Sequence, residues 1–236
     1  MKIEVWSDVV CPFCYVGKRR LEAALVTFPH RDAEEVVWRS FELAPDAPAE
    51  TGEPLEAMLA RKYGMEVAEA RAANARVTAM AAEVGLEFRL ERARSGNTFD
   101  AHRLLHLAAQ RGLGGEAKER LLRAYFTDGR AIGVRDELVA LGVELGMDDG
   151  EVRAALAGDA HAAAVRADER EARELGVRGV PFFVIDRRYA VSGAQPVDVF
   201  AGVLERAWAE RAPTLHVVRA GTNAACVDEA CAVPNG

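Results

Sequence analysis

The sequence predicts an α/β fold whose two halves lie at opposite ends of the chain. Residues 2–41 follow the order strand, helix, strand, and residues 182–208 follow the order strand, strand, helix. The long stretch between them has helical periodicity. With 236 residues, the chain can form one large domain or two intimately packed ones.

The N-terminal half begins with residues 2–7, whose alternating pattern predicts a strand. A C-x-x-C motif follows at positions 11–14, and apolar residues then recur at helical spacing as far as Phe28. A β-rich run over residues 36–41 predicts a second strand. Because two strands that flank a packed helix form a βαβ unit, we expect these strands to be parallel.

The C-terminal half begins with a predicted hairpin. Residues 182–185 and 189–192 read as its two strands, joined by a short turn. Apolar residues from Val197 to Trp208 then recur at the spacing of an amphipathic helix. A βαβ unit followed by a ββα unit is the arrangement of the thioredoxin fold. The sequence therefore predicts a thioredoxin fold with a large all-helical insertion between its βαβ and ββα halves.

The predicted domain boundaries follow from this arrangement. Residues 1–54 and 177–212 form the thioredoxin-like domain, residues 55–176 the helical insert, and residues 213–236 a flexible C-terminal tail. The insert explains why the chain is about twice as long as a minimal thioredoxin. Its helices are expected to end near Gly112, Gly133, Gly146 and Gly176.

Composition and charge exclude several classes of protein. Half of the residues are apolar and 28% are charged, which excludes collagen-like, wholly disordered and membrane-spanning chains. Thirty basic and 37 acidic side chains give a net charge of −7, so we expect no nucleic-acid and no membrane partner. The chain enters a strand at once and has only four cysteines, which predicts a cytoplasmic protein.

The C-x-x-C motif carries the first candidate chemistry. Cys11 and Cys14 lie at the first turn of the predicted helix, where side chains three residues apart are roughly 5–6 Å from each other at Cβ. A disulfide can form and open there with little backbone motion. The unpaired amides at the helix N-terminus favour a thiolate at Cys11, whereas Cys14 is deeper and less solvated. We therefore expect Cys11 to be the exposed nucleophile and Cys14 the resolving thiol. A zinc half-site is the alternative, but a C-x-x-C motif within a βαβ unit favours redox chemistry.

The Val180-Pro181 pair is the second candidate element. It precedes a β-rich run and stands where thioredoxin-like proteins place a cis-proline loop that faces the C-x-x-C motif. We therefore predict a cis bond before Pro181. The Val180 backbone is expected to bind an extended substrate segment in the manner of an added strand.

Four segments of the chain carry a family pattern: Asp8-Val9-Val10-Cys11-Pro12-Phe13-Cys14-Tyr15-Val16-Gly17, Asn97-Thr98 with Ala101-His102-Arg103, Gly179-Val180-Pro181-Phe182-Phe183, and Ser192-Gly193-Ala194-Gln195. They resemble the FrnE-like branch of the DsbA family, and the resemblance covers about residues 1–211. The resemblance implies a disulfide oxidoreductase without a bound organic cofactor or metal. Cys11 would be its nucleophile, Cys14 its resolving thiol and Pro181 its cis-proline. Protein or peptide disulfides would be its substrates, and glutathione or a thioredoxin-type protein its reductant.

The same resemblance leaves an isomerase or transferase open. Related 2-hydroxychromene-2-carboxylate isomerases and kappa-class glutathione transferases usually have serine at the first cysteine position, so both thiols of this chain disfavour those activities. Asn97, Thr98 and His102 favour them. The predicted substrate-binding residues are Pro12, Phe13, Asn97, His102 and Val180.

Two positions depart from the pattern of thioredoxin-like proteins. Many of these proteins bury an acid on the first strand six residues before the nucleophile, and this chain has Val5 there. Asp8 either takes over that role or is a residue of the helix-entry loop. The dipeptide Pro12-Phe13 offers no cation to hold a thiolate, so we do not expect a strong oxidant.

Cys226 and Cys231 form a second pair, spaced as C-x4-C in the predicted tail. Residues five apart in a helix point roughly 140° away from each other, so a bond between them needs a turn. Three interpretations stay open: an auxiliary redox pair that exchanges with Cys11 and Cys14, two incidental thiols, or a metal site. In the last case all four cysteines would form a zinc site.

Overall fold

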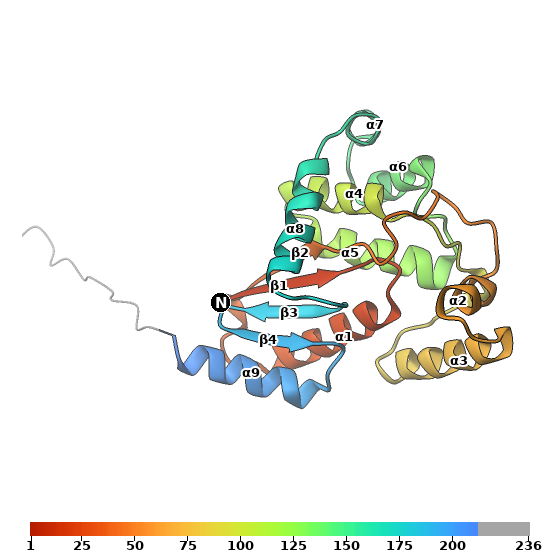
Figure 1. Cartoon of the computed structure of the whole chain (residues 1–236). Coiled ribbons are helices and arrows are strands. Elements are labelled where there is room, and N and C mark those ends of the chain that lie inside the picture. The colour runs from red at the N-terminus through yellow and green to blue at the C-terminus, as the bar shows by residue number, and fades with distance from the viewer. Residues whose placement is uncertain (212–236) are drawn as a thin grey trace, which may run out of the picture.

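The computed structural model describes residues 1–211 and contains a four-stranded sheet in the order β2-β1-β3-β4 (Figure 1). Strand β1 (Lys2–Ser7) pairs in parallel with β2 (Glu35–Ser40). On its other side β1 pairs antiparallel with β3 (Phe182–Ile185), which pairs antiparallel with β4 (Tyr189–Ser192). Because β1 contacts both β2 and β3, the two ends of the chain form one sheet. The predicted parallel pair and the predicted hairpin are confirmed.

Two helices cover one face of this sheet. They are α1 (Pro12–Thr27) and α9 (Val197–Ala209), which lie below the sheet in Figure 1. Alternate strand residues such as Ile3 and Phe183 point toward them and form a buried cluster with Leu21 and Phe200. The alternation of polar and apolar residues from Lys2 to Val5 is the reason that β1 could be recognised in the sequence.

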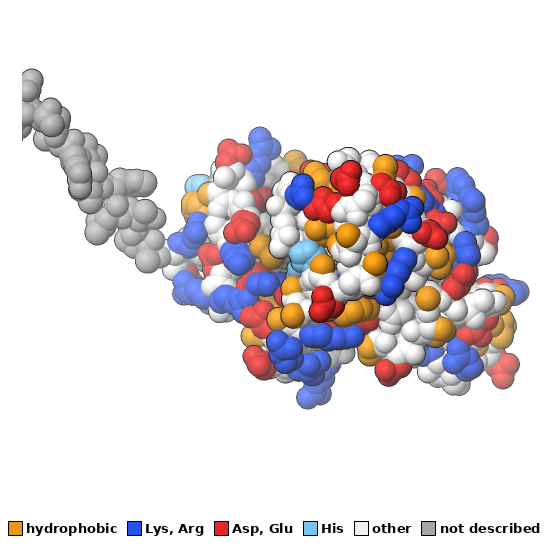
Figure 2. Space-filling view, turned by 90° about the horizontal axis from the view of Figure 1, so that it is seen from above, with side chains coloured by type: hydrophobic (Ala, Val, Ile, Leu, Met, Phe, Trp, Pro, Cys, Tyr) orange, Lys and Arg blue, Asp and Glu red, His pale blue; other side chains and the backbone are white. Residues whose placement is uncertain are grey.

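The other face is covered by the insert helix α8 (Ala162–Glu174). Trp6 and Val184 point to this face and pack with Ala172 of α8. The indole Nε1 of Trp6 donates a hydrogen bond to the backbone oxygen of Asp168 at 2.9 Å. Figure 2 shows side chains of both charges spread over the upper face of the molecule.

Every regular element of the insert, residues 55–176, is a helix or a helical turn, so the predicted fold class is confirmed. The domain boundaries derived from the sequence stay a prediction. No helix in residues 1–211 is long and apolar enough to cross a membrane. Besides α8, the insert contains α2 (Leu55–Tyr63), α3 (Val67–Glu83), α4 (Phe99–Gln110), α5 (Gly114–Arg123), a π-helical turn (Ala124–Asp128), α6 (Arg135–Glu144) and α7 (Asp149–Ala157), with 3-10 turns at Arg31–Ala33 before it and Leu90–Arg92 within it.

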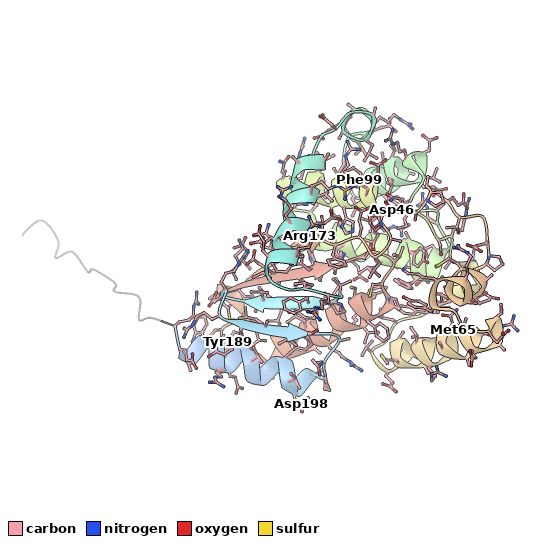
Figure 3. The ribbon with its side chains drawn as sticks, in the orientation of Figure 1. Asp46, Met65, Phe99, Arg173, Tyr189 and Asp198 are labelled. Carbon is pink, nitrogen blue, oxygen red and sulfur yellow. The ribbon has the colours of Figure 1, made fainter. Side chains whose placement is uncertain are left out.

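A single apolar cluster joins the insert to α1. Tyr15 of α1 lies 5.9 Å from Phe88 and 6.1 Å from Phe126 between ring centroids, and those two insert rings are 4.5 Å apart. Val9 and Val16 belong to the same buried cluster. The N-terminus of α1 therefore lies where the sheet, α1 and the insert meet. Figure 3 shows Met65, between α2 and α3, at the end of the molecule opposite Tyr189 of β4.

One of the predicted helix ends in the insert is wrong. Gly112, Gly146 and Gly176 follow helix ends with positive φ, but Gly133 precedes α6 and ends no helix. A Cβ at Gly133 would lie 2.1 Å from the backbone oxygen of Ala49, so close packing of two backbone segments requires glycine there.

The charged run over residues 166–171 is typical of solvated helix surface, but one of its members is buried. Asp168 is only 3% exposed. Its carboxylate accepts hydrogen bonds from the Ser40 amide at 2.9 Å and from Arg39 Nη1 at 3.0 Å. Helix α8 turns this residue toward β2, where the backbone and a guanidinium satisfy the buried charge.

Candidate active site

The two thiols of the C-x-x-C motif stand at the start of α1. Cys11 is the N-cap residue of this helix, and the Cys14 amide donates a hydrogen bond to the Cys11 carbonyl oxygen at 3.0 Å. Pro12 occupies the first helical turn, where its missing N–H costs nothing. Within residues 1–211 both cysteines are free thiols. The two thiols of the motif therefore lie one helical turn apart.

Cys11 was predicted to be exposed, and this prediction is wrong. Cys11 is only 3% exposed and Cys14 only 1%. The Cys11 Sγ donates a hydrogen bond to the backbone oxygen of Val180 at 3.4 Å, so the loop before β3 covers the thiol. A substrate that reaches Cys11 must displace this contact.

The covering loop is held tightly against α1. Its Val180–Pro181 peptide bond is cis, as predicted. A Cβ added to Gly17 would lie 3.0 Å from Pro181 Cγ and 3.2 Å from Phe183 Cζ. The Gly193 amide donates a hydrogen bond to the Pro181 oxygen at 2.8 Å. Glycine at position 17 therefore allows the proline loop to lie directly on α1 beside the thiols.

A buried carboxylate lies beneath the motif. Asp8 is fully buried, and its Oδ2 accepts a hydrogen bond from the Leu43 amide at 2.8 Å. Its Oδ1 lies 3.3 Å from His102 Nε2, without the alignment of a hydrogen bond. Burial alone would raise the pKa of Asp8, but the His102 imidazole, the Leu43 amide and the Lys118 ammonium together lower it. Of the two roles left open by the sequence, the structure favours a buried acid.

Lys118 of α5 is a second buried charge near the thiols, and the sequence analysis missed it. The residue is fully buried, and its Nζ donates a hydrogen bond to the Ser7 carbonyl oxygen at 3.4 Å. Burial lowers the pKa of Lys118 to about 8, although Cys14, Asp8 and Cys11 oppose the change. The signal was present: Lys118 precedes the buried Leu121 and Leu122 by three and four residues, which places it on the apolar face of its helix.

Cys14 is the thiol most affected by this environment. Burial raises the pKa of Cys14 well above its usual range, and the adjacent Cys11 adds to the rise. The ammonium of Lys118 and the backbone of Asp8 act in the opposite direction. Cys14 is therefore a neutral thiol in the resting dithiol and needs a proton acceptor before it can react as a thiolate.

Two of the predicted substrate-binding residues make contacts within the protein itself. His102 is only 1% exposed and contacts Asp8, so its side chain is closed to solvent, and its predicted contact with substrate stays a prediction. Asn97 donates to the Pro45 oxygen and accepts from the Phe99 amide, both at 2.8 Å. These bonds hold the start of α4, and Asn97 lines a cleft other than the one that borders the motif.

An apolar cavity of about 580 Å³ borders the C-x-x-C motif. Val10 and Pro12 form its side nearest the thiols, and residues of α2 and the π-helical turn form much of the rest. Phe13, which follows Pro12 in the sequence, is 42% exposed. The other residues that line the cavity include Leu55, Met58, Leu59, Arg61, Lys62, Tyr63, Leu90, Tyr125 and Phe126.

No group of three or more potential ligands within residues 1–211 could hold a metal ion. Cys226 and Cys231 lie outside the described residues, so the auxiliary redox pair and the four-cysteine zinc site stay predictions.

Comparison with known proteins agrees with this architecture. A family model described as a DSBA-like thioredoxin domain matches residues 2–205. The chain belongs to this DsbA-like family. A crystal structure titled probable DsbA oxidoreductase SCO1869, from Streptomyces coelicolor, is 49% identical, with a TM-score of 0.86 and 100% of each chain covered. The protein YwbO of Bacillus subtilis (strain 168) is 30% identical over 200 residues, which are 84% of this chain and 92% of YwbO.

A more distant DsbA-like structure shares the fold. The cytosolic disulfide reductase DsbM from Pseudomonas aeruginosa is 22% identical, with a TM-score of 0.61, and the match covers 89% of this chain and 99% of DsbM. Family membership and fold together identify the chain as a DsbA-like oxidoreductase.

Proposed function

We propose that the protein is a cytoplasmic thiol–disulfide oxidoreductase of the FrnE-like branch, which acts on protein or peptide disulfides through Cys11 and Cys14. One observation carries the proposal: two free thiols lie one turn apart at the N-terminus of α1, directly beneath the Val180 carbonyl. This arrangement combines a dithiol with a backbone acceptor at the place where an extended substrate would lie.

The exchange proceeds in two steps. The Cys11 thiolate attacks one sulfur of the substrate disulfide, and the other substrate sulfur leaves as a thiolate that takes a proton from solvent. Cys14 then attacks the Cys11 sulfur of this mixed disulfide, which forms the Cys11–Cys14 bond and releases the second substrate thiol. The substrate gains two electrons, and the enzyme loses them. Glutathione or a thioredoxin-type protein returns the enzyme to its dithiol form.

The apolar cavity indicates which substrates fit. It adjoins Pro12 and Val10, so an apolar side chain close to the substrate cysteine can enter it while the backbone pairs with Val180. Lys62 lies at the same cavity and favours a substrate with a carboxylate beyond that side chain, whereas Arg61 is paired with Glu53. An extended peptide disulfide meets these requirements.

Trapping experiments test the role of each thiol. In a background of Cys226→Ser and Cys231→Ser, the variant Cys11→Ser should lose reduction of insulin disulfides. Cys14→Ser should accumulate a mixed disulfide between Cys11 and the substrate, detected by mass spectrometry after alkylation. Trapping through Cys14 in the Cys11 variant, with none in the converse variant, would reverse the roles. Conversion of 2-hydroxychromene-2-carboxylate with glutathione that survives Cys14→Ser would favour an isomerase instead.

We also propose that Cys226 and Cys231 form an auxiliary redox pair. Arg211, the last described residue, follows α9 at the end of the molecule opposite the start of α1 (Figure 1). Cys226 follows it by fifteen positions in the sequence, which at full extension span about 50 Å. This reach is the reason to propose exchange with Cys11.

Deletion of residues 222–236 tests the auxiliary pair. The truncated chain should keep its thermal stability but change its turnover with a protein disulfide, and full-length Cys14→Ser should capture a bond between Cys11 and the tail. Unchanged turnover without such an adduct would make both cysteines incidental. One equivalent of zinc, bound by the full chain and lost in Cys226→Ser, would favour the four-cysteine metal site.

A further inference from the structure

Lys118 occupies a position that ordinary packing does not explain. Its ammonium is fully buried, yet among the described residues no carboxylate oxygen lies within 4.0 Å of it, and its one hydrogen bond is the 3.4 Å contact with Ser7. The neighbouring buried lysine, Lys18, pairs with Glu22 at 2.5 Å and with Glu119 at 2.6 Å. A buried ammonium without an ion-pair partner destabilises the fold, so its position calls for a functional reason.

Lys118 is buried beside the segment that carries the reacting groups. Its Nζ contacts the backbone oxygen of Ser7, the residue before Asp8, and lies 5.6 Å from the centroid of the Trp38 ring on β2. Asp8 and both thiols of the β1–α1 segment act on its charge, although no hydrogen bond joins Nζ to either sulfur in the resting dithiol. Helix α1 also carries Lys18, which repels Lys118 and lowers its pKa further. From the insert, His102 of α4 faces Asp8 rather than the lysine, and the Tyr125 hydroxyl of the π-helical turn hydrogen-bonds with Ser95 Oγ at 3.1 Å.

We propose that Lys118 is the proton acceptor for the resolving thiol: its neutral amine takes the proton of Cys14 as Cys14 attacks the mixed disulfide at Cys11. The inference rests on the proposed function, since it concerns the second step of the same exchange. The Cys14 S–H bond breaks, the N–H bond of an ammonium forms, and the new Cys11–Cys14 bond displaces the substrate thiolate. No co-reactant is needed beyond the substrate disulfide itself.

Two arguments favour Lys118 over the nearby Asp8. The pKa of Asp8 is lowered, and Oδ2 is occupied by the Leu43 amide, so its carboxylate is a weak proton acceptor. Lys118 has a pKa of about 8, which allows a neutral fraction near neutral pH. The negative charge of Asp8 then stabilises the ammonium that forms.

A reaction with two kinetic phases separates the attack by Cys14 from the attack by Cys11. In the Cys226→Ser and Cys231→Ser background, reduced protein is mixed with 5,5′-dithiobis(2-nitrobenzoate). The first release of thionitrobenzoate reports attack by Cys11, and the second reports attack by Cys14. Lys118→Met should leave the first phase within about 2-fold and slow the second by about 100-fold, because a general base typically contributes about 10²–10⁴-fold. The wild-type inflection near pH 8 in the second phase should disappear.

Lys18→Met is the matched control, because it also removes a buried lysine between α1 and α5. Because this change removes a charge that lowers the pKa of Lys118, the inflection should move to slightly higher pH. Well above pH 8 the rate of the second phase should stay within about 2-fold of the background rate. Asp8→Asn supplies a variant that keeps the lysine. Without the carboxylate, the pKa of Lys118 falls, so the inflection of the second phase should move to lower pH. This movement should vanish when Lys118→Met is combined with Asp8→Asn.

An unchanged second phase in Lys118→Met, an equal slowing of both phases, or an inflection that persists in that variant would overturn the inference. If Lys118→Met fails to fold, an inflection that does not move in Asp8→Asn overturns it instead. Failure of the proposed function gives a different result: the first phase would then survive Cys11→Ser.

Discussion

Replacement of Glu42 by glutamine should make the protein more stable above pH 7 and leave it nearly unchanged near pH 4.5. The Glu42 side chain, which follows β2, is 0% exposed. Its Oε2 lies 2.5 Å from Arg166 Nη1, and the same nitrogen lies 2.7 Å from Glu169 Oε2. Two carboxylates therefore share one guanidinium nitrogen, and Oε1 of Glu42 has no hydrogen-bond partner within the described part of the chain.

Burial and the adjacent Glu169 raise the pKa of Glu42 from 4.5 to about 7. Between these two values the folded state binds more protons than the unfolded state, so the free energy of unfolding falls as the pH rises. A rise of the pKa from 4.5 to about 7 lowers the free energy of unfolding by about 3 kcal/mol, and this loss is complete above pH 7. Glutamine at this position does not titrate and therefore avoids the loss.

Urea denaturation of the reduced protein at intervals from pH 5 to pH 8 measures the effect. The free energy of unfolding of Glu42→Gln minus that of the wild type should grow by about 2–3 kcal/mol over this range. Glu50→Gln is the control: the exposed Glu50 pairs with Arg94 and its pKa is lowered, so its difference should be flat above pH 5. A difference for Glu42→Gln that is also flat, within about 0.5 kcal/mol, would refute the reasoning.

Gly17→Val tests the packing of the site, with Gly202→Ala as its control, and Asp168→Ala tests the packing of α8. Gly17→Val should lower the free energy of unfolding by about 1–3 kcal/mol and reduce insulin reduction, because its Cβ would meet Pro181 at 3.0 Å. Gly202→Ala, in open space on α9, should instead stabilise by up to about 1 kcal/mol; equal effects of the two variants in urea denaturation would contradict the packing argument. Asp168→Ala should lower the free energy of unfolding by about 3 kcal/mol, because the Ser40 amide loses its acceptor. A decrease below about 0.5 kcal/mol would mean that the buried carboxylate contributes little to stability.

The parts of the fold and the site that could be predicted from the sequence depend on local spacing. The hairpin was predicted to the residue because its two strands alternate on either side of a turn in which Asp186 and Arg187 have positive φ. The dithiol was predicted because three residues of separation place Cys11 and Cys14 on one helical turn.

The parts that could not be predicted depend on packing across long stretches of sequence. Lys118 reaches Ser7 across 111 positions, and nothing in the pattern of α5 indicates which element covers its apolar face. Asp168 lies in a charged run that is typical of an exposed helix, and only the position of α8 on the sheet buries it. The burial of Cys11 likewise depends on Val180, 169 positions away. Long-range contacts of this kind leave no periodic signal in the sequence.

The packing of the Tyr15, Phe88 and Phe126 rings against one another links the evolution of the insert to that of helix α1. Each ring comes from a different segment, and each fills space that the other two leave. A change in the volume of one ring is tolerated only when another changes in compensation. We therefore expect these three positions to covary among relatives. A chimera that exchanges the insert without Tyr15 should fold less stably than one that exchanges all three.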